Sequence, residues 1–150
     1  METTKKNIVV IGAGYGGITA VLRLAMLFRK HPDYQIHLID KNPYHTLKTQ
    51  LHEAAVRKTE VTIPIERIIS KRNIKFHLGE VKKIDPDRHI VHVEDKSLPF
   101  DYLVLALGSQ THFYDIPGLQ QHAFQLQTLV DAQRIQDHIA RLCAQASSEP

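Results

Sequence analysis

Glycines crowd one short segment near the amino terminus, and they are the residues of this chain best suited to chemistry. Gly12, Gly14 and Gly17 form a GxGxxG arrangement, with Tyr15 and Gly16 inside it. Gly12 permits a tight turn, Gly14 lets the backbone approach a pyrophosphate without a Cβ in the way, and Gly17 lets a helix pack closely on a strand. A helix start also offers N–H groups and a partial positive charge to phosphates. The spacing therefore predicts a phosphate-binding loop.

Asp40 follows the next predicted strand, where a carboxylate can accept both hydroxyls of an adenosine ribose. A lone glycine loop is weak evidence, but the loop and the acid together predict a dinucleotide site. The alternative is a glycine-rich turn with no ligand and an ordinary exposed aspartate. We expect the Asp40 carboxylate to be uncommitted, so that it would repel a 2′-phosphate on the nucleotide. FAD and NAD share such a cradle, and the loop alone does not choose between them.

The elements that must position these groups follow from the apolar spacing. Residues 7–11 and 35–39 read as strands, the first a β-branched run buried on both faces as in a parallel sheet. Between them, apolar residues three and four apart predict a helix that Pro32 and Asp33 end. Its stripe consists of Ile18, Val21, Leu22, Ala25 and Phe28. This βαβ unit indicates an α/β fold with a central parallel sheet and helices.

Short strands and turns fill the middle of the chain. Apolar and extended runs separated by turn residues predict two more strands with a small β-meander between them. The two strands cover residues 73–78 and 102–107, and the meander pieces cover 79–84 and 89–94. Two short helices are expected at 51–56 and 63–69, the second with Pro64 in its first turn.

A final helix is predicted after a turn at 115–118. Thr128 and Asp131 resemble a capping pair that opens it. Its apolar stripe consists of Ala132, Ile135, Ile139, Leu142 and Cys143. We expect Cys143 to be buried in packing and residues 144–150 to form a frayed end.

The composition excludes several classes of protein. With 150 residues, 43% of them apolar and 23% charged, the chain resembles one soluble globular domain. The 19 basic and 16 acidic residues are scattered, so nucleic acid is not an expected partner. Apolar runs are too short to span a bilayer, and no cleavable signal segment precedes the first strand, so a cytoplasmic location is expected. A single cysteine excludes an internal disulfide framework.

The ten histidines do not predict a metal site. His52 and Glu53 begin like a zinc protease motif, but Val56 stands where the second histidine ligand belongs. His89 and His92 are three residues apart on an expected strand and would face opposite ways. No serine occupies a nucleophile-elbow pattern either.

The order of elements resembles the two-dinucleotide-binding flavoproteins, and among them the type II NADH:quinone oxidoreductases. The resemblance rests on IVVIGAGYGGITA at 8–20, DKNPYHTLKTQLHEAA at 40–55, DYLVLALGSQTHFYDIPG at 101–118 and HAFQL at 122–126. It implies a Rossmann-like FAD/NAD(P)-binding fold. In the family, a strand ends in an Ala-Thr-Gly-like turn toward the flavin, and here Ala106 and Gly108 flank Leu107 in place of the threonine.

The resemblance implies that the first glycine loop binds FAD. The residues matching Thr49, Gln50, Leu51 and His52 approach the isoalloxazine in such enzymes, Lys41 matches a position near the adenosine, and the backbone near Val81 faces the adenine. The implied cofactor-binding set is Gly12, Gly14, Tyr15, Gly16, Gly17, Asp40, Lys41, Thr49, Gln50, Leu51, His52, Val81, Ala106, Leu107 and Gly108.

The implied activity is that of a flavoprotein oxidoreductase of the respiratory chain, an NADH dehydrogenase that passes hydride from NADH to FAD and electrons on to a quinone. No residue here needs to act as a general base, and none is assigned as catalytic. The early helix lacks the redox-active cysteines of disulfide reductases, which favours a small acceptor such as quinone.

The family continues beyond the length of this chain, with an NAD-binding domain, a returning FAD segment and a carboxy-terminal membrane-docking region that places the parent enzyme peripherally on the cytoplasmic face. Residues 1–150 are therefore expected to be an incomplete FAD-binding domain that does not turn over by itself. A missing strand would leave an exposed sheet edge, through which the chain could self-associate.

Two other functions remain open from the sequence. One is a non-catalytic dinucleotide-binding module or truncated remnant, which would share every motif. The other is a flavin-free NAD-linked dehydrogenase domain. The meander and the turn at 106–109 count against this last reading.

Overall fold

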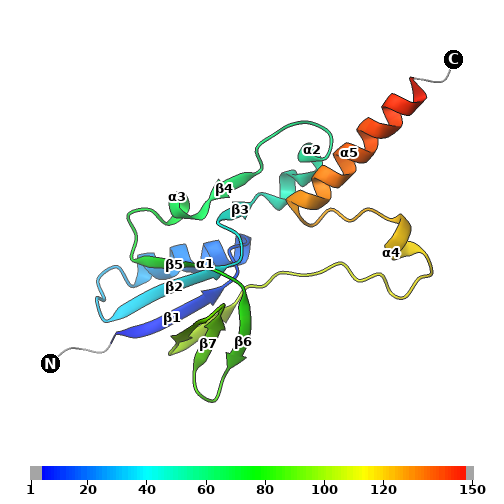
Figure 1. Ribbon diagram of the computed structural model, residues 1–150. Helices are drawn as coiled ribbons and strands as arrows, with labels where there is room; N and C mark the ends of the chain where they lie inside the picture. Colours follow the sequence, from blue (N-terminus) through cyan, green and yellow to red (C-terminus); the bar gives the residue numbers. More distant parts are fainter. Residues whose placement is uncertain (1–4, 148–150) are drawn as a thin grey trace. The chain divides into compact units, whose positions relative to one another are not determined.

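The computed structural model describes residues 5–147, and the chain forms two compact units (Figure 1). Met1–His45 and Ile63–Gly108 make the first unit, and Thr46–Thr62 and Ser109–Pro150 make the second. The glycine loop and Asp40 belong to the first unit, which is described first.

A four-stranded parallel sheet forms the centre of the first unit. Its strands are β1 (Lys6–Ile11), β2 (Tyr34–Asp40), β5 (Ile74–Leu78) and β9 (Tyr102–Leu105), in the order β5-β2-β1-β9. Every pair of neighbours is parallel, and Ile8 on β1 lies in register with Ile36 on β2 and Tyr102 on β9. The predicted α/β class with a central parallel sheet is confirmed.

Helix α1 (Tyr15–Leu27) covers one face of this sheet, together with the short helix α3 (Ile65–Ile69). The buried residues of this layer are Val10, Ala13, Ile18, Val21, Ile36, Leu38, Ile65, Ile69 and Ile74. The predicted stripe of α1 lies in this core, except that Phe28 follows the helix and stacks on Tyr34 with ring centroids 4.3 Å apart. Burial of these aliphatic side chains is the main stabilising contribution to this layer.

The β-meander covers the opposite face of the sheet. Its strands are β6 (Val81–Asp85), β7 (Ile90–Val93) and β8 (Lys96–Pro99), paired antiparallel. The buried core on this side consists of Val9, Ile11, Ile39, Val91 and Val93. Because successive residues of β1 point to opposite faces, its aliphatic run serves both layers, which confirms the prediction of a strand buried on both faces.

Other elements of the first unit differ from the predictions. Pro64 precedes helix α3 as its N-cap and ends the short strand β4 (Thr62–Pro64), which pairs with β3 (Tyr44–Thr46). Neither of these strands is predicted, since three-residue strands carry too little pattern to recognise. Strand β9 ends at Leu105, before the predicted end, and lies at one edge of the sheet with Leu105 58% exposed.

The second unit is helical. It contains the 3-10 turn η1 (Lys48–Gln50) and the helices α2 (Leu51–Ala54), α4 (Leu119–His122) and α5 (Leu129–Ala146). Its core consists of Leu51, Ala54, Ala55, Val61 and Ala132. The predicted short helix at 51–56 is confirmed but ends at Ala54, and α4 is not predicted.

The predicted capping pair opens helix α5. The N–H of Asp131 donates to the hydroxyl of Thr128 over 3.1 Å, and the N–H of Thr128 donates to the Asp131 carboxylate over 2.8 Å. Burial opposes ionisation of Asp131, but hydrogen bonds from Thr128 and from the N–H of Gln127 outweigh it and hold the pKa of this carboxyl below its usual value.

The rest of helix α5 corrects two predictions. Of the predicted stripe, Ala132 is buried, whereas Ile139 and Leu142 are 43% and 49% exposed, and Cys143 is exposed where it was expected to be buried. Within the described residues, the core of this unit takes only Leu129, Ala132 and Ile135 from the helix, so apolar spacing alone does not bury its second half. The helix also runs through Ala146, inside the predicted frayed end, of which residues 148–150 lie outside the described part. Within residues 5–147, no helix has both the length and the apolar content needed to cross a bilayer.

Candidate dinucleotide site

The turn between β1 and α1 is shaped by two glycines that no other residue could replace. Gly12 has a φ of +100°, and a Cβ there would lie 2.3 Å from the carbonyl oxygen of Ala106. A Cβ on Gly17 would lie 1.7 Å from the carbonyl oxygen of Gly12. Both distances are far below any non-bonded contact, so the helix start, the loop and the end of β9 meet only because these side chains are absent.

Gly14 differs from these two, because a Cβ there would meet no protein atom within 4 Å. It is the N-cap of α1, no side chain caps the helix start, and the first turn carries no acidic residue. An uncapped helix start in front of open space suits an anion, which supplies the missing partner for the terminal N–H groups. The cradle therefore fits the diphosphate of a dinucleotide.

Asp40 holds the loop in place with its carboxylate. Oδ2 accepts the N–H of Ala13 over 2.6 Å, and Oδ1 accepts the N–H of Asn42 over 2.8 Å. The expectation of an uncommitted carboxylate is therefore wrong, because both of its oxygens already accept backbone N–H groups. Each oxygen keeps a second lone pair, which is enough to accept a ribose hydroxyl.

His45 makes a contact with the loop that no sequence pattern predicts. Its ring is 4% exposed, and Nδ1 lies 2.7 Å from the carbonyl oxygen of Ala13. Because a carbonyl only accepts, Nδ1 carries the proton and donates it. The ring also packs edge-on against Tyr15, with centroids 4.9 Å apart.

The segment that precedes Val81 is fixed beside Asp40. The N–H of Gly79 donates to the Asp40 carbonyl over 2.9 Å. The N–H of Glu80 donates to the Glu94 carboxylate over 2.6 Å, and the N–H of Glu94 returns a 3.1 Å bond to the Glu80 carbonyl. The backbone predicted to face an adenine is thus held from two sides.

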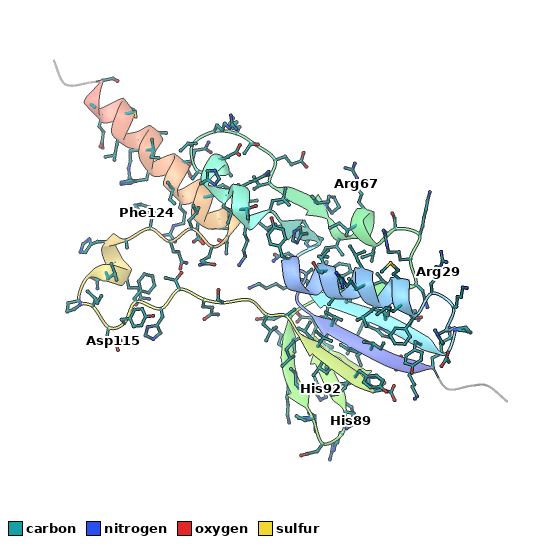
Figure 2. The ribbon with its side chains drawn as sticks, turned by 180° about the vertical axis from the view of Figure 1, so that it is seen from behind. Arg29, Arg67, His89, His92, Asp115 and Phe124 are labelled. Atoms are coloured by element: carbon teal, nitrogen blue, oxygen red, sulfur yellow. The ribbon has the colours of Figure 1, made fainter. Side chains whose placement is uncertain are left out.

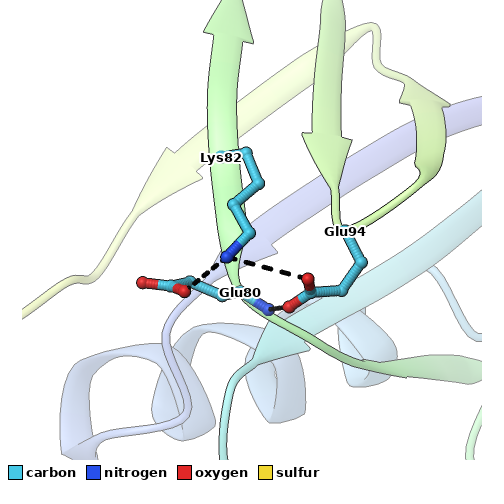
Figure 3. A network of polar contacts seen from close by, with 3 residues as sticks. All are labelled: Glu80, Lys82 and Glu94. Carbon is cyan, nitrogen blue, oxygen red and sulfur yellow. Dashed lines mark hydrogen bonds and ion pairs between the residues drawn. The ribbon is translucent and has the colours of Figure 1, made fainter.

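An exposed ionic cluster reinforces this segment (Figure 3). Lys82 Nζ lies 2.6 Å from Glu80 Oε2 and 3.7 Å from Glu94 Oε2. Its hydrogen bond to Glu80 lowers the pKa of that carboxyl and raises the pKa of Lys82, and the charge of Lys41 adds to the effect on Glu80. Since all these groups are exposed, we assign the cluster a role in local geometry rather than in stability.

Ala106 brings the end of β9 to the glycine loop. Its N–H donates to the carbonyl of Ile11 over 2.8 Å, and its Cβ would lie 3.4 Å from a Cβ on Gly17. Leu107 is 68% exposed, and Gly108 has a φ of +76° with open space around it. The structure thus brings Ala106 to the glycine loop, and the approach of residues 106–108 to a flavin stays a prediction.

Four predicted site residues belong to the second unit. Leu51 is 1% exposed in the core of that unit, so its side chain packs there rather than facing a ligand. Thr49, Gln50 and His52 are exposed. Their approach to an isoalloxazine stays a prediction.

The histidines of the meander have partners of their own. His89 stacks on Phe100 with ring centroids 5.3 Å apart, and the hydroxyl of Ser97 lies 3.1 Å from Nδ1 of His92. Figure 2 shows both histidines on the meander. Across residues 5–147, no three His, Cys, Asp or Glu side chains gather as metal ligands would. Glu53, of the incomplete zinc motif, instead pairs with Arg57.

Comparisons with solved structures agree with this fold. The sulfide:quinone oxidoreductase of the hyperthermophilic bacterium Aquifex aeolicus superposes with a TM-score of 0.79 at 31% identity, over 93% of this chain and 32% of that one. NDH2 of Plasmodium falciparum in complex with NADH gives a TM-score of 0.75 at 23% identity, over 88% of this chain and 28% of that one. The predicted Rossmann-like class is confirmed.

The sequence comparisons give the family. A type II NADH:quinone oxidoreductase of Staphylococcus aureus strain NCTC 8325 / PS 47 is 35% identical over 142 residues, which confirms the predicted resemblance. The match covers 93% of this chain and 35% of the relative, so the chain spans about a third of the length of such relatives. The family model for pyridine nucleotide-disulphide oxidoreductases matches residues 6–145. The chain belongs to the pyridine nucleotide-disulphide oxidoreductase family.

Proposed function

We propose that this chain is the FAD-binding part of a flavin-dependent NADH:quinone oxidoreductase. The observation that carries the proposal is the open cradle at Gly14, in front of the uncapped start of α1. The 35% identity to a type II NADH:quinone oxidoreductase supports FAD as the cofactor and a quinone as the acceptor. The parent enzyme would work in a respiratory chain, peripherally on the cytoplasmic face of the membrane.

The residues of this chain bind and orient. The loop at 12–17 holds the diphosphate, Asp40 accepts a ribose hydroxyl, and the backbone at Val81 faces the adenine beside Lys41. The turn at 106–108 faces the isoalloxazine end. When bound, FAD would supply the redox chemistry that couples oxidation of NADH to reduction of a quinone. Nothing in this arrangement requires a side chain to act as a general base.

The proposal predicts that the purified chain, incubated with FAD and freed of excess ligand, keeps the visible absorption bands of bound flavin. A chain that loses FAD but binds NADH would instead be a dehydrogenase domain without flavin. Binding of neither would identify an inert remnant. Turnover with NADH and a soluble quinone tests the parent activity separately, and we expect none from this chain alone.

We also propose that the sheet edge at β9 pairs with a second copy of the chain when no further strand covers it. An edge strand offers unpaired backbone groups, and Tyr102 and Leu105 on β9 are 52% and 58% exposed. Sedimentation velocity should show a concentration-dependent dimer. The substitution Leu105→Lys places a charge on this edge and should shift the equilibrium toward the monomer. If the variant dimerises as strongly as the original chain, the edge is not the interface.

A further inference from the structure

We propose that His45 is a positioning residue that fixes which way the peptide between Ala13 and Gly14 faces, so that the loop presents N–H groups rather than a carbonyl to an anion. The inference rests on the proposed dinucleotide binding and adds a residue to which no binding role is otherwise given. It follows from the hydrogen bonds on either side of Ala13.

Both peptide groups of Ala13 are held by side chains from other strands. Its N–H donates to Asp40 Oδ2 at the end of β2 over 2.6 Å. Its carbonyl accepts from His45 Nδ1, on β3, over 2.7 Å. In a trans peptide the C=O and the next N–H point in opposite directions, so the N–H of Gly14 points away from His45. Two side chains that are 27 and 32 residues distant in sequence thus determine the loop's polarity.

The loop needs these two contacts because its glycines would otherwise allow the peptide between Ala13 and Gly14 to face either way. With Gly12 and Gly14 on either side, the backbone at residue 13 could rotate its next peptide at little steric cost. A rotated peptide would turn the Ala13 carbonyl toward the space in front of Gly14, where its partial negative charge would repel a phosphate. Prearranged N–H dipoles attract an anion without this reorganisation.

The surroundings of His45 make the contact rigid. The side chain is 4% exposed, and its ring packs edge-on against Tyr15, the first residue of α1. A buried ring held on a strand has few rotamers to lose on forming the hydrogen bond. The same ring therefore contacts the loop and the helix start that follows it.

Two substitutions of His45 in the full chain separate the donor from the packing. His45→Phe keeps a ring of similar shape but has no donor, and His45→Asn keeps an N–H donor near the position of Nδ1. We expect His45→Phe to raise the dissociation constants of FAD and of ADP at least about tenfold, and His45→Asn to stay within about threefold of the original chain. Flavin fluorescence quenching and calorimetry with ADP measure the two constants.

Equal FAD affinity of His45→Phe and the original chain would overturn the inference, as would equal losses in both variants. An NMR readout decides it without any cofactor. The original chain should show a slowly exchanging Nδ1 proton on His45 and an Ala13 carbonyl carbon shift that moves in His45→Phe and is restored in His45→Asn. A rapidly exchanging Nδ1 proton in the original chain would refute the contact itself, whereas failure of the original chain to bind FAD would refute the proposed function alone.

Discussion

Replacing Gly17 with alanine is expected to lower the free energy of unfolding by about 3 kcal/mol and to abolish FAD binding. The added Cβ would lie 1.7 Å from the carbonyl oxygen of Gly12. Gly12 cannot move to relieve this clash, because it is packed against the carbonyl group of Ala106. A Cβ on Gly12 would itself lie 2.3 Å from that carbonyl oxygen. The clash must therefore open the contact between α1, β1 and the end of β9. Urea denaturation followed by circular dichroism measures the loss.

Gly14→Ala is the matched control, because the two glycines are three positions apart in the same loop. Its Cβ would meet no protein atom within 4 Å, and its φ of −70° suits alanine. Unfolding should therefore change little, while FAD binding should weaken at least about tenfold, because the methyl group fills the space left for the diphosphate. Equal stability of the two variants would contradict the packing argument. Unchanged FAD binding by Gly14→Ala would place the diphosphate elsewhere.

The elements that the sequence predicts well are those whose pattern is local. Residues 8–11 of β1 are all apolar because both faces of the strand are covered there, and Thr128 with Asp131 forms a capping box that four consecutive residues define. The spacing of the loop glycines is equally local, since Gly12, Gly14 and Gly17 lie within six consecutive residues. These features need no knowledge of distant residues.

The features that the sequence does not predict depend on distant partners. The hydrogen bonds of Asp40 and His45 to Ala13 cross 27 and 32 residues, and neither side chain differs in type from an ordinary exposed one. Cys143 is exposed because the core of its unit takes only Leu129, Ala132 and Ile135 from the described part of α5, which the spacing of the helix does not reveal. The burial of a side chain depends on its neighbours in space, so the apolar spacing along a helix overestimates how many of its side chains are buried.

A pair of histidines under the meander is expected to make the first unit unstable in acid. His37 on β2 and His77 on β5 share a face of the sheet, and Nδ1 of His37 lies 2.9 Å from Nε2 of His77. The other ring nitrogen of His37, Nε2, lies 3.2 Å from the side-chain oxygen of Asn7. Burial, then the charges of His77 and Lys75, lowers the pKa of His37 from 6.5 to about 4. Burial likewise lowers the pKa of His77, with help from Lys75 and Lys96.

The lowered pKa values of both histidines determine how the stability of the folded chain changes with pH. Above pH 6.5 His37 is neutral in both the folded and the unfolded chain. Below pH 6.5 the unfolded chain binds a proton at His37, whereas the folded chain does not bind it until the pH falls to about 4. Stability should therefore fall as the pH drops through this window, by about 2 kcal/mol once water access to the partly exposed His77 is allowed for. Within residues 5–147 neither ring pairs with a carboxylate, Lys75 repels both protonated rings, and Lys96 repels that of His77.

His37→Gln tests this account, because glutamine does not titrate and can keep a hydrogen bond to Asn7. Urea unfolding at pH 7, 5.5 and 4.5 should show the original chain losing stability over this range, while the variant loses only the smaller share due to His77. His31→Gln, which removes an exposed histidine in the same unit, should follow the original chain. If His37→Gln declines as steeply as the original chain, the acid sensitivity does not originate in this pair. A flatter profile in the variant alone would show that burying a neutral histidine pair beneath the meander limits the stability of the dinucleotide unit in acid.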